Sequence, residues 1–112
     1  MVHPSKRKGN AFEREIVSQA RELGLPAKRA WGSDGRSLGE NPEVDCIVDS
    51  IKIQAKRRAA IPAWLRPSEH VDAQVFREDR GEAFVMIPLW DYLQLLKQTR
   101  GLTDEKSADC LG

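Results

Sequence analysis

The sequence predicts a single α/β domain in which helices flank a mixed β-sheet. Its 112 residues are about the length of one domain. Apolar residues make up 40% and charged residues 31% of the chain, which is typical of a folded globular protein rather than a disordered one. Stretches with helical and strand-like apolar patterns follow one another in the order α-β-β-β-α-β-α. No apolar run approaches the roughly 20 residues that a transmembrane helix needs.

The first element is a helix expected over residues 10–23. Apolar side chains recur there at three- and four-residue steps and form one stripe, made of Phe12, Ile16, Val17, Ala20 and Leu23. Asn10 is expected to cap the start of this helix, with Glu13 three residues later as in a capping box. Gly24 suits the end of the helix, because glycine readily adopts the left-handed conformation that terminates many helices.

Three short strands and a long loop follow the helix. Residues 26–31 predict the first strand. Residues 32–43 are rich in Gly, Ser, Asp and Asn and therefore predict a loop. This loop is long for a connection within a compact domain, and long loops of this kind are often functional. Residues 44–48 and 51–56 are expected to pair as two strands joined by a tight turn at positions 49–50.

The second half of the chain predicts a helix, a strand and a second helix. A proline is well placed to begin a helix over residues 67–79, which would bury Val71 and Val75. Residues 82–89 are the most apolar run of the chain and predict a buried central strand. A final short helix is expected over residues 90–99.

These elements divide the chain into three parts. Residues 1–9 are expected to form a flexible basic arm, residues 10–100 the folded domain, and residues 101–112 a polar C-terminal tail. No internal repeat or low-complexity segment interrupts this organisation.

The charged residues are unevenly distributed along the chain. Residues 1–66 carry 13 Lys and Arg against 8 Asp and Glu, while residues 67–112 carry 5 against 9, so the net charge of +1 conceals a basic first part. Basic residues cluster at positions 6–8, 28–29 and 56–58. These clusters are compatible with a phosphate-binding face, and equally with an ordinary solvated surface.

The cysteines and histidines argue against a structural zinc site. Cys46 lies in a predicted strand and Cys110 in the last three residues, with no CxxC motif and no Cys/His cluster. This use of cysteine favours a reduced, cytoplasmic compartment. His3 and His70 are isolated, and we expect each to lie at the surface or to pack rather than to bind a metal.

The predicted hairpin has one apolar face. With a two-residue turn, residues whose numbers sum to 99 face each other, so Val48 faces Ile51 and Cys46 faces Ile53. All four are apolar and are expected to point toward the core. A slip of one residue would scramble this face, which fixes the register.

The other face of the hairpin collects residues that suit phosphodiester chemistry. Asp45 is expected directly opposite Gln54, with Lys56 two residues further along the same face. An acid and an amide oxygen at this distance can share a hard cation such as Mg²⁺. A lysine beside them can hold or help deprotonate an attacking water. The simpler alternative is a solvated sheet face on which Lys56 forms only a cross-strand ion pair with Glu43.

Several stretches resemble one nuclease family. "PEVD…QAK" is similar to the PD…(D/E)xK signature of the restriction-endonuclease-like superfamily. "KGNAFERE" at the first helix and "RAWGS" after it complete a resemblance, over residues 8–58, to archaeal-type Holliday junction resolvases and their phage relatives. The resemblance implies a restriction-endonuclease-like fold and phosphodiester hydrolysis that depends on Mg²⁺, with Mn²⁺ as a substitute. It also implies a homodimer that cuts opposed strands of branched DNA at a four-way (Holliday) junction.

The resemblance assigns metal and catalytic positions residue by residue. Glu13 matches the family's first acidic residue, Asp45 the main metal-binding aspartate, and Lys56 the catalytic lysine. Gln54 occupies the second acidic position, and the Ala55 carbonyl is expected to help hold the metal. Gln54 departs from the family pattern, because an amide oxygen can coordinate a metal but brings no negative charge.

The resemblance also implies contacts with DNA. Arg29 and Ser33 match the strand and loop residues that contact the phosphate near the active site. Arg57 and Arg58 extend from the catalytic strand and are expected to contact the DNA backbone without reading its sequence. Lys8, in the basic arm, is expected to reach a second duplex arm, with a disordered tail as the alternative.

Several functions stay open on the sequence alone. The resemblance favours a structure-specific endonuclease that resolves junctions in the cytoplasm of a bacterium or of a phage-infected cell. Gln54 supports the alternative of a DNA-binding module of the same fold with weak or lost catalysis. A nuclease for flaps, nicks or damaged duplex and a plain interaction domain are further alternatives. Trp31 and Trp64 are expected to pack rather than to stack on bases, with a dimer contact as an alternative for Trp64.

Overall fold

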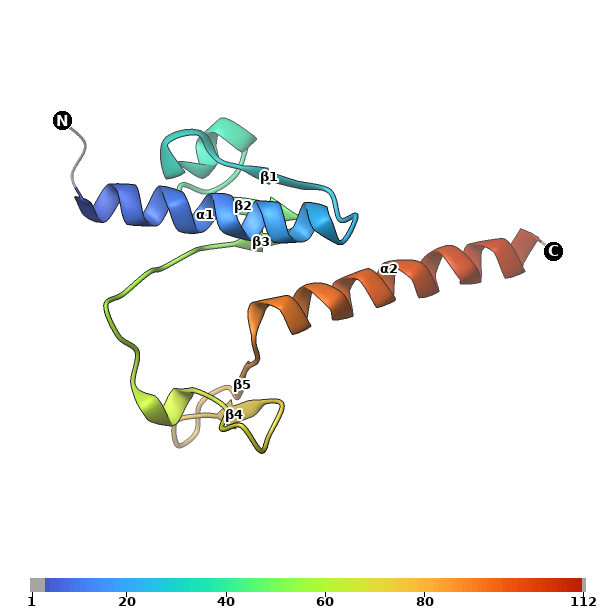
Figure 1. Ribbon diagram of the computed structural model, residues 1–112. Coiled ribbons are helices and arrows are strands. Elements are labelled where there is room, and N and C mark those ends of the chain that lie inside the picture. The colour runs from blue at the N-terminus through green and yellow to red at the C-terminus, as the bar shows by residue number, and fades with distance from the viewer. Residues whose placement is uncertain (1–3, 112) are drawn as a thin grey trace.

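The computed structural model describes residues 4–111, apart from the side chains of residues 4–8, 33 and 101–111. Two helices and two small antiparallel sheets make up a small mixed α/β domain (Figure 1). In chain order the elements are α1 Pro4–Glu22, β1 Ala27–Arg29, β2 Cys46–Val48, β3 Ile51–Ile53, β4 Gln74–Phe76, β5 Phe84–Met86 and α2 Leu89–Leu111. Three single 3₁₀ turns, at Trp31–Ser33, Gly35–Leu38 and Ala63–Leu65, lie in the connections.

The first half of the chain forms a three-stranded sheet packed against α1. The strand order is β1-β2-β3, and both pairings are antiparallel. In the hairpin, Cys46 pairs with Ile53 and Val48 with Ile51, so the predicted register is confirmed at these positions. The predicted turn at positions 49–50 is also present. This sheet therefore presents the expected apolar face to the helix.

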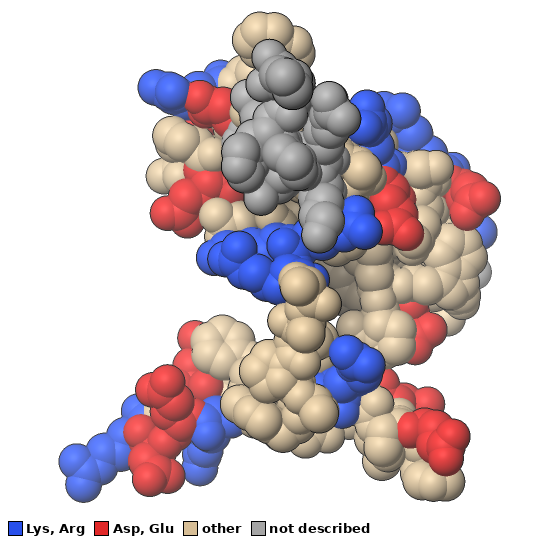
Figure 2. Space-filling model, turned by 60° about the vertical axis from the view of Figure 1, so that its left-hand side comes forward, with Lys and Arg blue, Asp and Glu red and all other residues tan. Residues whose placement is uncertain are grey.

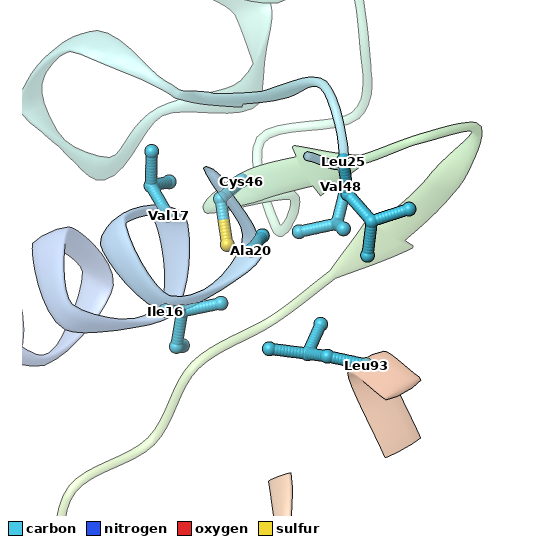
Figure 3. Close-up of a cluster of buried hydrophobic side chains, with 7 residues drawn as sticks. All are labelled: Ile16, Val17, Ala20, Leu25, Cys46, Val48 and Leu93. Atoms are coloured by element: carbon cyan, nitrogen blue, oxygen red, sulfur yellow. The ribbon is translucent and has the colours of Figure 1, made fainter. Parts of the chain in front are cut away.

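One core holds the helix, the sheet and the last helix together. Figure 3 shows side chains from α1, from β2 and from α2 converging on the same space. The buried members of this core are Ile16, Val17, Ala20, Leu25, Cys46, Val48 and Leu93. Because Leu93 is the member from α2, it ties the C-terminal helix to the first half of the chain.

Helix α1 begins earlier than the sequence pattern predicts. It starts at Pro4, so Asn10 lies inside the helix and is not its N-cap. Proline is favoured in the first turn of a helix, so Pro4 sets the start of α1 in place of the capping-box pattern at Asn10 and Glu13. The end of the helix is as predicted, since Gly24 has a φ of 80° and the Leu25 N–H donates to the Ala20 carbonyl at 3.0 Å.

The helix expected over residues 67–79 is wrong, and the strand expected over residues 82–89 is present only as the shorter, mostly exposed β5. Instead β4 and β5 pair with each other in a separate hairpin, with Val75 opposite Val85. β-Branched and aromatic residues, which are frequent in this segment, favour strands. Arg80, with a φ of 62°, lies in the turn that joins β4 and β5. The resulting sheet is exposed rather than central, so two antiparallel sheets replace the single mixed sheet.

Helix α2 is longer than the predicted helix over residues 90–99. It runs to Leu111 and so includes residues expected in the polar tail. Arg100 on this helix lies 3.3 Å from the Asp49 carboxylate in the β2–β3 turn, which adds a second link between α2 and the first sheet. The division of the chain into an arm, a domain and a tail stays a prediction. Among residues 4–111, no helix is long and apolar enough to cross a membrane.

We predict that Leu93→Ala lowers the free energy of unfolding by about 2–5 kcal/mol, because it opens a cavity in the shared core. Urea unfolding followed by circular dichroism would measure this. Leu95→Ala is the matched control, since Leu95 lies on the same helix but is 51% exposed. We expect that control to cost about 0.5 kcal/mol or less. Equal effects of the two substitutions would contradict the shared core.

Candidate active site

Asp45 lies at the end of the first sheet and is held there by hydrogen bonds on both sides. It directly precedes β2 and is 8% exposed. Its backbone N–H donates to the Ile53 carbonyl at 2.9 Å, and its carbonyl accepts from the Ala30 N–H at 2.8 Å. Its carboxylate accepts a hydrogen bond from the Ala55 N–H at 2.7 Å. The backbone and side chain of this acid are therefore fixed by the segments that flank it.

Glu13 and Arg29 form a partly buried ion pair between α1 and β1. Glu13 is 3% exposed, and one of its carboxylate oxygens lies 3.9 Å from a guanidinium nitrogen of Arg29. The same guanidinium donates to the Asn10 carbonyl at 3.4 Å. Arg29 thus holds the middle of α1 against the sheet and partly offsets the charge of Glu13.

The carboxylates of Glu13 and Asp45 both influence the pKa of the Cys46 thiol. Cys46 follows Asp45 in the chain and is completely buried. Burial, together with the negative charges of Glu13 and Asp45, raises the pKa of Cys46 to about 11. Both carboxylates therefore lie within electrostatic reach of Cys46, one from the helix and one from the strand.

The donor set around Asp45 fits a hard divalent cation. A buried carboxylate is costly unless it is paired or bound to a metal, and within the part of the chain that the structure describes Asp45 forms no ion pair. The described residues contain no group of three or more His, Cys, Asp and Glu side chains suited to a metal. Mg²⁺ needs no such group, because one or two carboxylates suffice when water and phosphate supply the other ligands.

The predicted pairing of Asp45 with Gln54 is absent from the described strand register. The strand pairing ends at Cys46 and Ile53, and the Asp45 N–H bonds to the Ile53 carbonyl instead of pairing with Gln54. Gln54 and Lys56 are exposed, and among the described contacts neither bonds to Asp45. Ala55 lies between Gln54 and Lys56, and its N–H donates a hydrogen bond to the Asp45 carboxylate. The expected Asp45–Gln54 pair is therefore not formed.

The loop after β1 is ordered by its own hydrogen bonds. The Asp34 carboxylate accepts from the Arg36 N–H at 3.0 Å and pairs with its guanidinium, which lowers the pKa of Asp34. Gly35 is buried so closely that a Cβ there would collide with the Asn41 carbonyl. Ser33 has its backbone in the first 3₁₀ turn, while its side chain lies outside the described part of the chain.

The residues expected to contact DNA are partly visible at the surface. Arg57 and Arg58 are exposed on the segment that leaves β3, directly after Lys56. Figure 2 shows Lys and Arg side chains gathered across the middle of one face, where the molecule narrows. The side chain of Lys8 lies outside the described residues. The distribution of basic residues is compatible with phosphate binding on this side.

Sequence reasoning was wrong about two tryptophans. Trp31 and Trp64 were expected to pack, but they are 83% and 65% exposed. Trp64 makes an edge-to-face contact with Phe76, with ring centroids 5.8 Å apart. The position of Trp31 beside a glycine in a polar loop was the signal that favoured exposure.

A family model described as archaeal Holliday junction resolvase (hjc) matches residues 4–96. No curated protein and no solved structure matches the chain. The matched segment covers most of the sequence, including Glu13, Asp45 and Lys56. The chain therefore belongs to the archaeal Holliday junction resolvase family.

We predict that the Cys46 thiol resists alkylation in the folded chain. With a pKa of about 11, only about one thiol in a thousand is ionised at pH 8, and the side chain is also shielded from reagent. The test is the rate of iodoacetamide labelling in a Cys110→Ser variant, which leaves Cys46 as its single cysteine. The same variant in urea is the control and should react at the rate of a free thiol. Fast labelling without urea would show that the site is open.

Proposed function

We propose that this member of the archaeal Holliday junction resolvase family hydrolyses phosphodiester bonds at four-way DNA junctions with the help of Mg²⁺. Family membership supports a nuclease that acts on Holliday junctions. The observation that carries the metal-dependent mechanism is the buried Asp45 carboxylate, which has one backbone hydrogen bond and whose charge acts, with that of the buried Glu13, on the Cys46 thiol. The site of action we propose is the cytoplasm of a bacterium or of a phage-infected cell.

Asp45 and Glu13 are the acidic residues that would hold the cation, with the Gln54 amide and the Ala55 carbonyl as neutral oxygen donors. A bound Mg²⁺ would supply a Lewis acid that lowers the pKa of water and offsets negative charge on the phosphate. Mn²⁺ is expected to substitute, because it accepts the same oxygen ligands. The Ala55 N–H bond fixes one oxygen of Asp45, which keeps the carboxylate oriented before a ligand arrives.

Lys56 is the residue we propose to orient the attacking water. It directly follows Ala55, whose N–H is bonded to Asp45, so its backbone lies close to the acid although its side chain is free in solvent. An ammonium group near the scissile phosphate can donate hydrogen bonds to the water and to a developing negative oxygen. Its side chain would turn toward the site when the phosphate is bound.

Arg29, Ser33, Arg57, Arg58 and Lys8 are proposed to hold the DNA. Arg29 reaches the acidic pair through Glu13 and keeps about a third of its side chain exposed, so it can meet a phosphate without leaving the site. Arg57 and Arg58 extend the basic surface along the segment after β3. Backbone contacts of this type give affinity that falls steeply with salt and carry no sequence preference.

A homodimer would give the two active sites that paired cuts require. The β4–β5 hairpin supports this, because a two-stranded sheet is at best marginally stable alone, and Val75 and Val85 expose apolar surface on it. Trp64 is exposed beside the same hairpin and contacts Phe76. We propose that a second copy of the chain covers this surface, in agreement with the preference of oligomers for two-fold symmetry.

Gln54 favours the second candidate function, a branched-DNA-binding module with weak catalysis. The amide adds no charge at the position where the family pattern has an acid, and Gln54 is exposed and makes no hydrogen bond to Asp45 among the described contacts. Such a module would bind junctions without needing a metal. Cleavage experiments therefore have to be accompanied by binding measurements.

We predict that Lys56→Ala lowers the rate of junction cleavage by about 10²- to 10³-fold, because a donor to the developing charge is lost. The measurement is cleavage of a labelled four-way junction, beside a linear duplex of the same sequence, with Mg²⁺ and with chelator. Lys52→Ala is the matched control, since Lys52 is also an exposed lysine of this segment but pairs with Glu40 at 2.9 Å.

Paired, metal-dependent nicks on the junction alone, retained in Lys52→Ala and lost in Lys56→Ala, are the expected result. Tight junction binding without cleavage in any metal would instead favour the binding module. A chain that neither binds nor cuts the junction would refute both.

We predict that the chain sediments with the mass of two copies and that Val85→Asp shifts it toward one copy. A charge at the exposed centre of the hairpin would have to be buried without a partner if a second copy covered it. Analytical ultracentrifugation measures the shift, with Glu82→Ala, beside the same strand, as a control that removes no apolar surface. A wild-type chain that sediments as a monomer at all concentrations would contradict the dimer.

A further inference from the structure

Trp31 is the most exposed of the large apolar residues that the structure describes. It stands directly after Ala30, at the start of the first 3₁₀ turn, with 83% of its surface open to solvent. An indole ring that stays in water lacks the large favourable free energy that its burial would provide. Single exposed apolar residues are nevertheless common, so exposure alone assigns no role. What distinguishes Trp31 is how it is held and what lies beside it.

The backbone of Trp31 is braced rather than loose. Its N–H donates to the Ser37 hydroxyl oxygen at 2.8 Å, and its carbonyl accepts from the Asp34 N–H at 3.2 Å. The Ser37 hydroxyl in turn donates to the Asp34 carbonyl at 3.0 Å. These bonds close a small ring of contacts at the base of the side chain. The loop therefore presents the indole from a fixed point.

That fixed point adjoins the candidate active site. The Ala30 N–H, one residue before Trp31, donates to the Asp45 carbonyl at 2.8 Å. Arg29, one residue further back, pairs with Glu13. Consecutive Cα atoms are about 3.8 Å apart, so the Trp31 backbone lies within two residues of one group bonded to the Asp45 backbone and of another paired with the Glu13 carboxylate. A nucleotide next to a phosphate held at this site is thus within reach of the ring.

The chemistry of the ring points to a base rather than to a phosphate. An indole has a flat π-face and one N–H donor, and it stacks on nucleobases without regard to their identity. In a continuous duplex both faces of each base pair are already covered by neighbours, and opening a step costs energy. At a branch point the stack is interrupted, and base faces become available. A braced, exposed indole beside the cutting site therefore fits branched DNA better than linear DNA.

We propose that Trp31 stacks on an exposed base at the branch point and so determines the preference of this chain for junctions over linear duplex. The proposal rests on the proposed function, because it assumes that junction DNA occupies the site. Trp31 is a specificity-determining residue in this scheme and takes no part in the hydrolysis. It differs in this from Arg29 and Lys56, which act on phosphate and water.

The test compares binding of the full-length chain to a four-way junction and to a linear duplex, by fluorescence anisotropy in chelator so that no cutting occurs. Trp31→Ala is expected to weaken junction binding by about 5- to 100-fold, the loss typical of one base-stacking contact. Its duplex binding and melting temperature should stay close to wild type. Trp31→Phe should keep most of the preference, and Leu95→Ala, which removes another exposed apolar side chain, should keep all of it.

A second readout reports the stacking itself. 2-Aminopurine at the crossover loses fluorescence when it stacks, so the wild type and Trp31→Phe should quench it and Trp31→Ala should not. Equal quenching and an equal junction preference in Trp31→Ala would overturn the Trp31 proposal and leave the proposed function intact. A wild type without junction preference would overturn both. A change of assembly mass in Trp31→Ala would overturn the proposal in favour of a protein contact.

Discussion

Three hydrogen bonds of Asp45 connect the strands that hold the candidate active-site residues. They join the residue after β1, the residue before β2, the end of β3 and the segment that follows it. The sheet receives α1 through the Glu13–Arg29 pair. The sheet continues from there into an apolar face that packs against α1 and Leu93. Each of the two buried acids next to this core therefore has its own compensation, the Ala55 N–H for Asp45 and the Arg29 guanidinium for Glu13.

The first half of this arrangement could be predicted from the sequence. Alternation in the hairpin gave the register of Cys46 with Ile53, because only that register keeps one face apolar. The helical stripe and Gly24 predicted where α1 packs and ends. The family resemblance was confirmed over residues 4–96. These features depend on short-range patterns that a single sequence contains.

The rest could not be predicted, for physical reasons that differ from place to place. The Asp45 side chain competes with the strand ladder for the Ala55 N–H, so the pairing ends before Gln54, and periodicity cannot reveal that competition. Val71 and Val75 have a spacing that suits a helix, but β-branched and aromatic residues around a turn favour β4 and β5 instead. The exposure of Trp31 depends on a ring of loop hydrogen bonds that involves Ser37 and Asp34.

We propose that the buried Asp45 carboxylate binds a divalent cation. The most direct measurement is the amide resonance of Ala55 in a ¹⁵N NMR titration with Mg²⁺, because that N–H is bonded to the carboxylate. We expect a saturable shift at Ala55 that disappears in Asp45→Asn, with Gly81 in the β4–β5 hairpin unchanged in both. An Ala55 resonance that does not move at Mg²⁺ concentrations at which the chain cuts a junction would contradict it.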